Sequence, residues 1–178
     1  SVTWRRYCTP THDLVAKFDK EKDTRYASSI LWKSVPYDTY WPADSYPLSY
    51  KIREKTSNII LMRLADILLL KAEALVELDR TPEAIRIVNG IRERAGFAPS
   101  SLDENMGQAR NERQLELYME GQRWFDLVRN NRLLEVMQKH KDKDGRLLFA
   151  GLQAFRQLWP IPQGEKDKNT NLTQNGGY

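Results

Sequence analysis

The sequence contains a single cysteine, Cys8, and only two histidines, His12 and His140, in 178 residues. One thiol cannot form a disulfide within the chain, and it also excludes a four-ligand zinc site built on cysteines. The two histidines are far apart, and neither has a second ligand at metal-binding spacing. We therefore expect neither a bound metal nor another cofactor.

The sequence also lacks long apolar runs and a strong excess of charge. No stretch of about 18 apolar residues occurs, so no segment is predicted to span a membrane, and residues 1–6 lack the apolar core of a signal peptide. The net charge is only +4, with acidic and basic residues interleaved, which argues against a nucleic-acid partner. With 40% hydrophobic and 29% charged residues, the chain can form a compact core.

Three regions of different character are predicted within one domain. Residues 1–57 form a loop-rich aromatic segment, residues 58–137 a helical bundle, and residues 138–178 an extended tail that packs back on the bundle. The expected fold class is mainly α, with tetratricopeptide-like helix pairs and an irregular, loop-rich subdomain.

Aromatic side chains are concentrated in residues 26–50, which hold seven of the 18 aromatic residues of the chain. Pro36, Pro42 and Pro47 exclude a long helix or a central strand there, so we expect a loop on the surface of the bundle. Rings on such a loop either anchor it to the body or stack on the C–H face of a sugar. The candidates for ligand contact are Trp32, Tyr37, Tyr40 and Trp41.

Apolar periodicity predicts helices over residues 59–78, 82–95 and 104–120, and a fourth helical segment from residue 123. Pro82 at the start of the second helix and Gly96 after its end are typical helix boundaries. The first two helices would form a hairpin of the tetratricopeptide kind. The core of the fourth segment is expected to include Trp124, Phe125 and Leu127.

The helical region carries charged side chains where a packed bundle would bury them. Glu112, Glu116 and Glu120 recur every four residues, and like charges at this spacing destabilise an isolated helix by roughly 0.2–0.5 kcal/mol per pair. We therefore expect arginines from other helices to meet them, and Arg63 to pair with Asp66. The predicted structural charge network consists of Arg63, Asp66, Glu73, Arg92, Arg94, Glu112, Glu116, Glu120, Arg123 and Asp126.

Paired carboxylates also catalyse glycoside hydrolysis, so a hydrolase that uses Glu112, Glu116 or Glu120 is a further hypothesis. An arginine-paired carboxylate has a lowered pKa and makes a poor general acid. The pattern therefore favours a structural role for these acids.

Five motifs, in order, resemble the C-terminal half of the SusD/RagB family, the outer-membrane nutrient-binding lipoproteins of glycan-foraging Gram-negative bacteria. The motifs are Asp23 to Arg25; Arg63 to Asp66 with Ala72 to Ala74; Asn89 to Gly96; Glu112 to Arg129; and Pro160 to Pro162 with Asn169 and Gln174 to Tyr178. The resemblance covers residues 23–178 and departs from the family pattern at Gly176, where proline is usual.

The resemblance implies a non-enzymatic protein that captures an oligosaccharide or a similar nutrient at the outer surface of the outer membrane. It also implies delivery of that ligand to a TonB-dependent, SusC-like transporter. The lipid anchor, which is the expected link to the membrane, would lie in an N-terminal part that this sequence does not include, because no signal region precedes Cys8. The alternative is a helical-repeat module for protein–protein interaction, in which the aromatic loop is purely structural.

Overall fold

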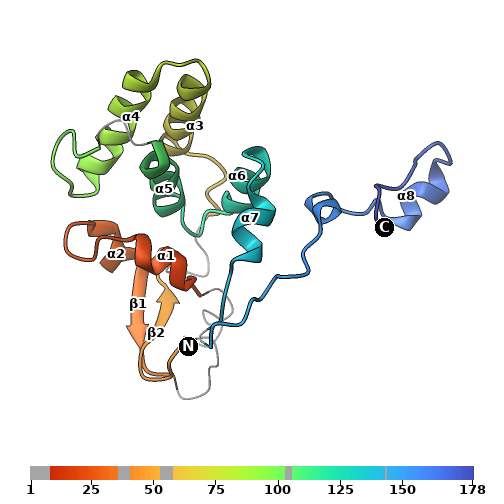
Figure 1. Cartoon of the computed structure of the whole chain (residues 1–178), viewed down its shortest axis with the longest axis horizontal. Helices are drawn as coiled ribbons and strands as arrows, with labels where there is room; N and C mark the ends of the chain where they lie inside the picture. Colours follow the sequence, from red (N-terminus) through yellow and green to blue (C-terminus); the bar gives the residue numbers. More distant parts are fainter. Residues whose placement is uncertain (1–8, 36–40, 53–57, 103–105, 143) are drawn as a thin grey trace. The chain divides into compact units, whose positions relative to one another are not determined.

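The computed structural model describes residues 9–35, 41–52, 58–102, 106–142 and 144–178. These residues form eight α-helices, one 3-10 helix and one two-stranded sheet (Figure 1), which confirms the prediction of a mainly α fold. The chain divides into two compact units, Ser1–Arg123 and Trp124–Tyr178, called the first and the second unit below. Within the described ranges, no helix combines the length and apolar composition needed to cross a membrane.

The first unit opens with α1 (His12–Lys17), α2 (Thr24–Ser29) and two strands, β1 (Ile30–Lys33) and β2 (Tyr46–Ser49). The strands pair antiparallel, with Trp32 opposite Pro47. Both strands are sheet edges, so a proline in β2 interrupts no central ladder. The aromatic region, predicted as a loop, therefore contains a strand pair.

A buried apolar cluster joins α1 to the strand pair. Phe18, which directly follows α1, Ile30 of β1 and Tyr46 of β2 are 4%, 3% and 1% exposed, respectively. The whole cluster comprises Leu14, Val15, Phe18, Ile30, Trp41, Tyr46, Leu48 and Leu115. Leu115 belongs to α5 (Met106–Glu116), so the cluster also fixes α5 against the N-terminal elements.

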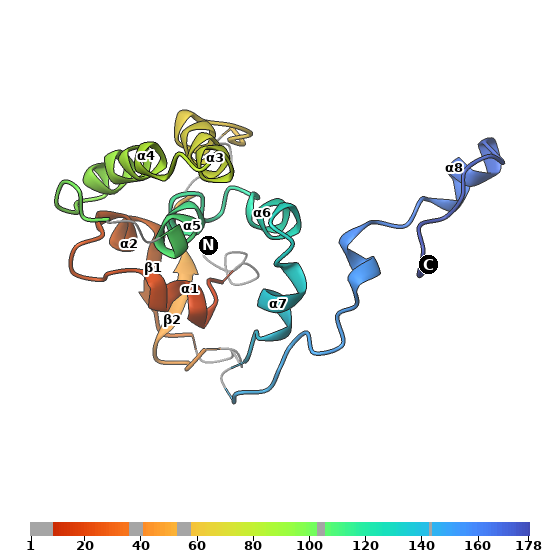
Figure 2. The same ribbon diagram turned by 45° about the horizontal axis from the view of Figure 1, so that its top comes forward.

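Helices α3 (Leu64–Glu77) and α4 (Thr81–Arg94) form a helical hairpin (Figures 1 and 2), as the sequence pattern predicts. Small residues at the contact positions let the two helices approach closely, and leucine, valine and isoleucine fill the space between them. The second buried cluster is formed by Ala65, Leu69, Ala72, Leu75, Ala84, Val88, Ile91 and Leu102.

Helix α3 begins five residues later than predicted, because Arg63 is extended, with φ −147° and ψ 164°. Apolar content alone placed the start at Ile59. However, residues 59–62 are outside any helix, and Ile59 is 85% exposed. The apolar run therefore predicted the helix correctly but not its first residue.

Helix α4 ends as predicted, in a Schellman motif around Gly96. The Phe97 amide donates to the Arg92 carbonyl and the Gly96 amide to the Glu93 carbonyl, both at 3.0 Å. Gly96 has φ +99°, and the amide of Thr24 donates to the Ala95 carbonyl at 2.9 Å. The end of α4 is thereby joined to the start of α2.

The loop after α4 is held by one buried amide side chain. Asn89 Nδ2 donates to the Leu102 carbonyl at 3.0 Å, and Asn89 Oδ1 accepts from the Leu102 amide at 2.9 Å. The side chain thus pairs with Leu102 as a neighbouring strand would, and this brings Leu102 into the helical core.

Helix α5 ends at Glu116, four residues before the predicted end. Met119 and Gly121 adopt positive φ angles of 66° and 76°, which a right-handed helix cannot accommodate. Glu120 therefore lies in a turn beyond α5, although its spacing suggests a continuous helix.

The second unit contains α6 (Arg123–Arg129, which starts at the boundary), α7 (Leu133–Gln138), the 3-10 helix η2 (Ala154–Gln157) and α8 (Gln163–Lys168). Leu127 and Leu133 are buried, whereas Phe125 is 65% exposed. The prediction that Phe125 belongs to the core is wrong, because the seven-residue α6 buries the side that carries Asp126 and Leu127.

The C-terminal residues close on themselves through side-chain hydrogen bonds. Gln174 pairs with both backbone groups of Ile161, at 2.8 and 3.0 Å. The Tyr178 hydroxyl donates to the Leu158 carbonyl at 2.8 Å, and the Tyr178 ring meets Phe155 edge-on. The tail, predicted to be extended, therefore contains two short helices and a closed loop.

The positive φ of Gly96 predicts that Gly96→Ala destabilises the first unit. An added Cβ would lie 2.7 Å from the Lys22 carbonyl oxygen, and the left-handed backbone adds strain of about 1–3 kcal/mol. Gly90→Ala is the matched control, because its Cβ would meet nothing within 4 Å and alanine favours a helix by about 1 kcal/mol. Thermal unfolding should give a lower melting temperature for Gly96→Ala and an unchanged or higher one for Gly90→Ala. Equal melting temperatures would contradict the structure.

Candidate functional site

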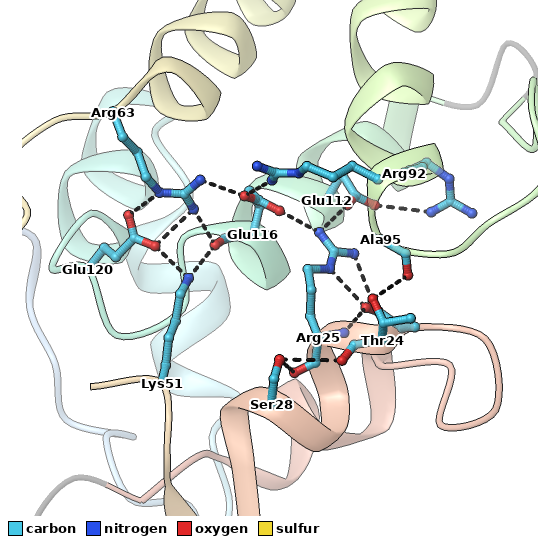
Figure 3. Close-up of polar contacts among 12 residues, drawn as sticks. Thr24, Arg25, Ser28, Lys51, Arg63, Arg92, Ala95, Glu112, Glu116 and Glu120 are labelled. Carbon is cyan, nitrogen blue, oxygen red and sulfur yellow. Dashed lines mark hydrogen bonds and ion pairs between the residues drawn. The ribbon is translucent and has the colours of Figure 1, made fainter. Parts of the chain in front are cut away.

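A network of ion pairs lies at the C-terminal end of α5 and is centred on Glu116 (Figure 3). The Glu116 side chain is 3% exposed. Its carboxylate accepts from Arg25 at 2.8 Å and Arg63 at 2.6 Å, and Arg94 is a third donor. These arginines come from α2, from the residue before α3, and from α4, so one carboxylate joins three segments to α5.

Glu112, one turn earlier on α5, extends the network. Its side chain is 1% exposed and accepts from Arg25 at 2.6 Å and from Arg92 at 3.1 Å. Arg25 therefore bridges Glu112 and Glu116. The two like charges on α5 share a guanidinium group instead of facing each other unpaired.

Arg25 is itself fixed by Asp23. The carboxylate of Asp23 accepts from Nε and Nη2 of Arg25, each at 2.8 Å, a bidentate pairing that fixes the guanidinium plane. The same carboxylate accepts from the Arg25 amide at 3.0 Å and caps α2. This explains why an aspartate stands two residues before the arginine.

Glu120, in the turn after α5, is held by Arg63 and Lys51. Arg63 Nε and Lys51 Nζ lie 2.7 and 2.5 Å from its carboxylate oxygens. Both cations also donate to the Glu116 carbonyl, at 2.7 and 2.6 Å. They thus satisfy a backbone acceptor at the end of α5, where cations are electrostatically favoured.

The side chains of Arg63 and Asp66 take different partners, so the predicted ion pair between these residues is wrong. Asp66 instead meets Arg113 of α5, with Arg113 Nη1 at 2.7 Å from its carboxylate. Arg113 Nε lies 3.7 Å from Glu73. The extended backbone of Arg63 directs its side chain to α5, whereas the i,i+3 rule applies only within a helix.

The remaining members of the predicted network lie at the boundary and in the second unit. Asp126 is buried and accepts from Arg129 at 3.0 Å, a contact local to α6. Arg123 begins the same helix. The prediction omitted Arg25 and Lys51, although the Asp23-x-Arg25 motif had already marked the first of them.

The arginines keep the central carboxylates ionised. Burial alone would raise the pKa of Glu116, but hydrogen bonds from Arg63, Arg25 and Arg94 outweigh it and lower the pKa to about 2. The pKa of Glu120 is also lowered, because bonds from Arg63 and Lys51 outweigh its burial. A glycosidase needs one carboxyl that retains its proton, and neither group meets that need.

The two described aromatic candidates, Trp32 and Trp41, bond and stack with residues outside this network. Trp41 is 8% exposed, stacks on His12 at a centroid distance of 3.7 Å, and donates from Nε1 to the Pro10 carbonyl. Its prediction as a ligand-contacting ring is corrected, because a ring buried against its own chain presents no face to a sugar. The side chain anchors the segment between the strands.

Trp32 is partly exposed and lies on β1. Its Nε1 donates to the Tyr26 hydroxyl at 2.8 Å, and its ring meets Trp41 edge-on at 5.4 Å. Tyr37 and Tyr40 lie outside the described residues. The structure therefore brings Trp32 and Trp41 together. Of these two candidates, Trp32 is the one whose ring is partly accessible.

Comparison with known proteins agrees with this arrangement of motifs and helices. Residues 37–178 match the SusD family. SusD-like protein P38 from Formosa agariphila is 36% identical over 94% of this chain and 33% of its own length. The chain belongs to the SusD family.

Two further comparisons concern proteins with named ligands. Starch-binding protein SusD from Bacteroides thetaiotaomicron is 29% identical over 85% of this chain and 26% of its own length. Surface glycan-binding protein A from Bacteroides thetaiotaomicron, solved in complex with laminarihexaose, has the same fold, with a TM-score of 0.71 and 21% identity. That similarity covers 94% of this chain and 41% of the solved one. The chain spans about a third of the length of the curated relatives it matches.

The lowered pKa of Glu116 predicts an acid-sensitive contribution to stability. The folded pKa, about 2, lies below the ordinary 4.5, so the contribution is complete above pH 4.5 and is lost as the pH falls toward 2. It amounts to about 3 kcal/mol. At pH 7, the urea concentration at the unfolding midpoint should therefore be lower for Glu116→Gln than for the wild type. This difference in midpoint should shrink as the pH falls from 4.5 to 2.

The control for this experiment is Glu83→Gln, because Glu83 forms an exposed pair with Arg80 on the surface of α4. An exposed pair contributes little to stability, so the urea midpoint of Glu83→Gln should stay close to that of the wild type. A Glu116→Gln protein with wild-type stability at pH 7 would contradict the central place of Glu116.

Proposed function

We propose that this chain is part of a non-catalytic cell-surface protein that binds an oligosaccharide. The observation that carries the proposal is membership of the SusD family, which includes a protein named for starch binding. A solved neighbour with the same fold was captured with laminarihexaose. The state of the carboxylates supports a non-catalytic role, since Glu116 and Glu120 have lowered pKa values and are held by arginines and a lysine.

The aromatic segment before the helical hairpin is the proposed ligand surface. Trp32 suits stacking on a sugar, because its ring is partly exposed and the bond from its indole nitrogen to Tyr26 fixes its orientation. Trp41 lies edge-on to it and supports it from the core. Tyr37 and Tyr40 remain proposed contacts on the strength of their place in the sequence.

The alternative is an interaction module in which these rings are structural. The burial of Trp41 and Tyr46 favours that role for part of the segment. The two functions differ in what the exposed rings do. A structural ring contributes to stability and not to glycan binding. A ring that contacts the ligand contributes to glycan binding and not to stability.

We expect Trp32→Ala and Tyr40→Ala each to weaken glycan binding by the full-length protein about twofold to thirteenfold, because each loses one aromatic contact worth about 0.5–1.5 kcal/mol. Isothermal titration with laminarihexaose and with maltoheptaose measures this loss. Phe125→Ala removes an exposed ring from α6 and serves as the control, with unchanged binding expected. Loop variants that bind as the wild type but melt at lower temperature would favour the interaction module.

We further propose that the full-length protein is a lipoprotein on the outer surface of the outer membrane and delivers its ligand to a TonB-dependent, SusC-like transporter. Family membership supports this partner. Affinity purification of the full-length protein from detergent-solubilised outer membranes should yield such a transporter at near-equal amounts. Recovery with a soluble cytosolic partner instead would contradict both the location and the partner.

A further inference from the structure

Six aliphatic side chains of the first unit form an exposed apolar surface where the chain enters α3. This 59–67 surface consists of Ile59, Ile60, Leu61, Met62, Leu64 and Ile67, which are 43% to 85% exposed. Single exposed apolar residues are common on proteins, but a contiguous group of this kind marks an interaction surface.

The segment is presented in a fixed position. Arg63, in the middle of the surface, is extended and bonded to Glu116 and Glu120. The Leu61 carbonyl accepts from the side chain of Gln122 at 3.5 Å. Ile59 to Met62 lie outside any helix or strand, and all four side chains are at least half exposed. These four side chains are therefore accessible to a partner.

The chemistry of the 59–67 surface favours a protein surface as its occupant. All six side chains are aliphatic or thioether groups, without the flat rings and polar groups that hold sugars. The one charged residue among them, Arg63, donates from its guanidinium nitrogens to Glu116 and Glu120. An apolar protein segment can cover such a surface without leaving polar groups unpaired.

The lengths of the relatives indicate where that segment comes from. The four curated relatives align with this chain over only 26% to 34% of their own length, so a protein of their length has about two to three times as much chain again. We propose that the 59–67 surface is the docking face for that remaining part of the same protein. The proposal rests on family membership and not on glycan binding.

Photo-crosslinking in the full-length protein tests this directly. p-Benzoylphenylalanine replaces Leu61 in one variant and Arg86, an exposed residue of α4, in the control. Mass spectrometry should identify a cross-link from position 61 to a peptide of the same protein outside these 178 residues, and none from position 86. A cross-link to a transporter, a cross-link only within residues 1–178, or no cross-link at position 61 would overturn the proposal.

A second measurement does not depend on cross-linking chemistry. Leu61→Asp should lower the melting temperature of the full-length protein by several degrees, because a carboxylate would be buried at the docking face. Arg86→Asp should leave the melting temperature nearly unchanged. Equal melting temperatures for Leu61→Asp and the wild type would show that the face is open to solvent and would overturn the proposal.

Discussion

The first unit depends on the pairing of one buried carboxylate with three arginines. Glu116 is brought together with Arg25, Arg63 and Arg94, which are 91, 53 and 22 residues away in the chain. A buried charge without a partner is costly, and removing one partner of such a pair typically costs 3–5 kcal/mol. The α2, α3 and α4 segments must therefore reach their places together for this network to form.

The network also explains which polar residues stand where they do. Asp23 orients Arg25, and Arg25 separates the like charges of Glu112 and Glu116. Lys51 and Arg63 close the end of α5 through the Glu116 carbonyl. Each contact satisfies a group that the fold would otherwise bury unpaired. The two apolar clusters form the core of the first unit, and the ion-pair network fixes the positions of its elements relative to one another.

The proposed ligand site lies outside this charge network. Because the acids of α5 and its following turn are bonded to cations, they serve the scaffold, and the partly exposed Trp32 is the better candidate for ligand contact. The apolar 59–67 surface differs from both, because it offers neither charges nor flat rings. The chain thus combines a buried charge network, a partly exposed aromatic ring and an exposed apolar surface, each with a distinct physical character.

Some features followed from the sequence alone because they depend on local rules. The α3–α4 hairpin, its alanine contacts and the Gly96 stop follow from apolar spacing, helix boundaries and backbone freedom. Charged residues at core positions likewise predict that Glu112 and Glu116 meet arginines. The helix boundaries depend on residues within one or two turns of each other. The buried acids need a cationic partner, whichever residue supplies it.

Other features were decided only by tertiary structure. Which arginine meets which acid depended on the extended backbone at Arg63, so Asp66 pairs with Arg113 and not with its near neighbour. The burial of Trp41 and the exposure of Phe125 depended on what packs over them. Composition states which side chains can be buried or paired. Only the arrangement of distant segments determines which of them are, because burial and pairing are properties of neighbours in space.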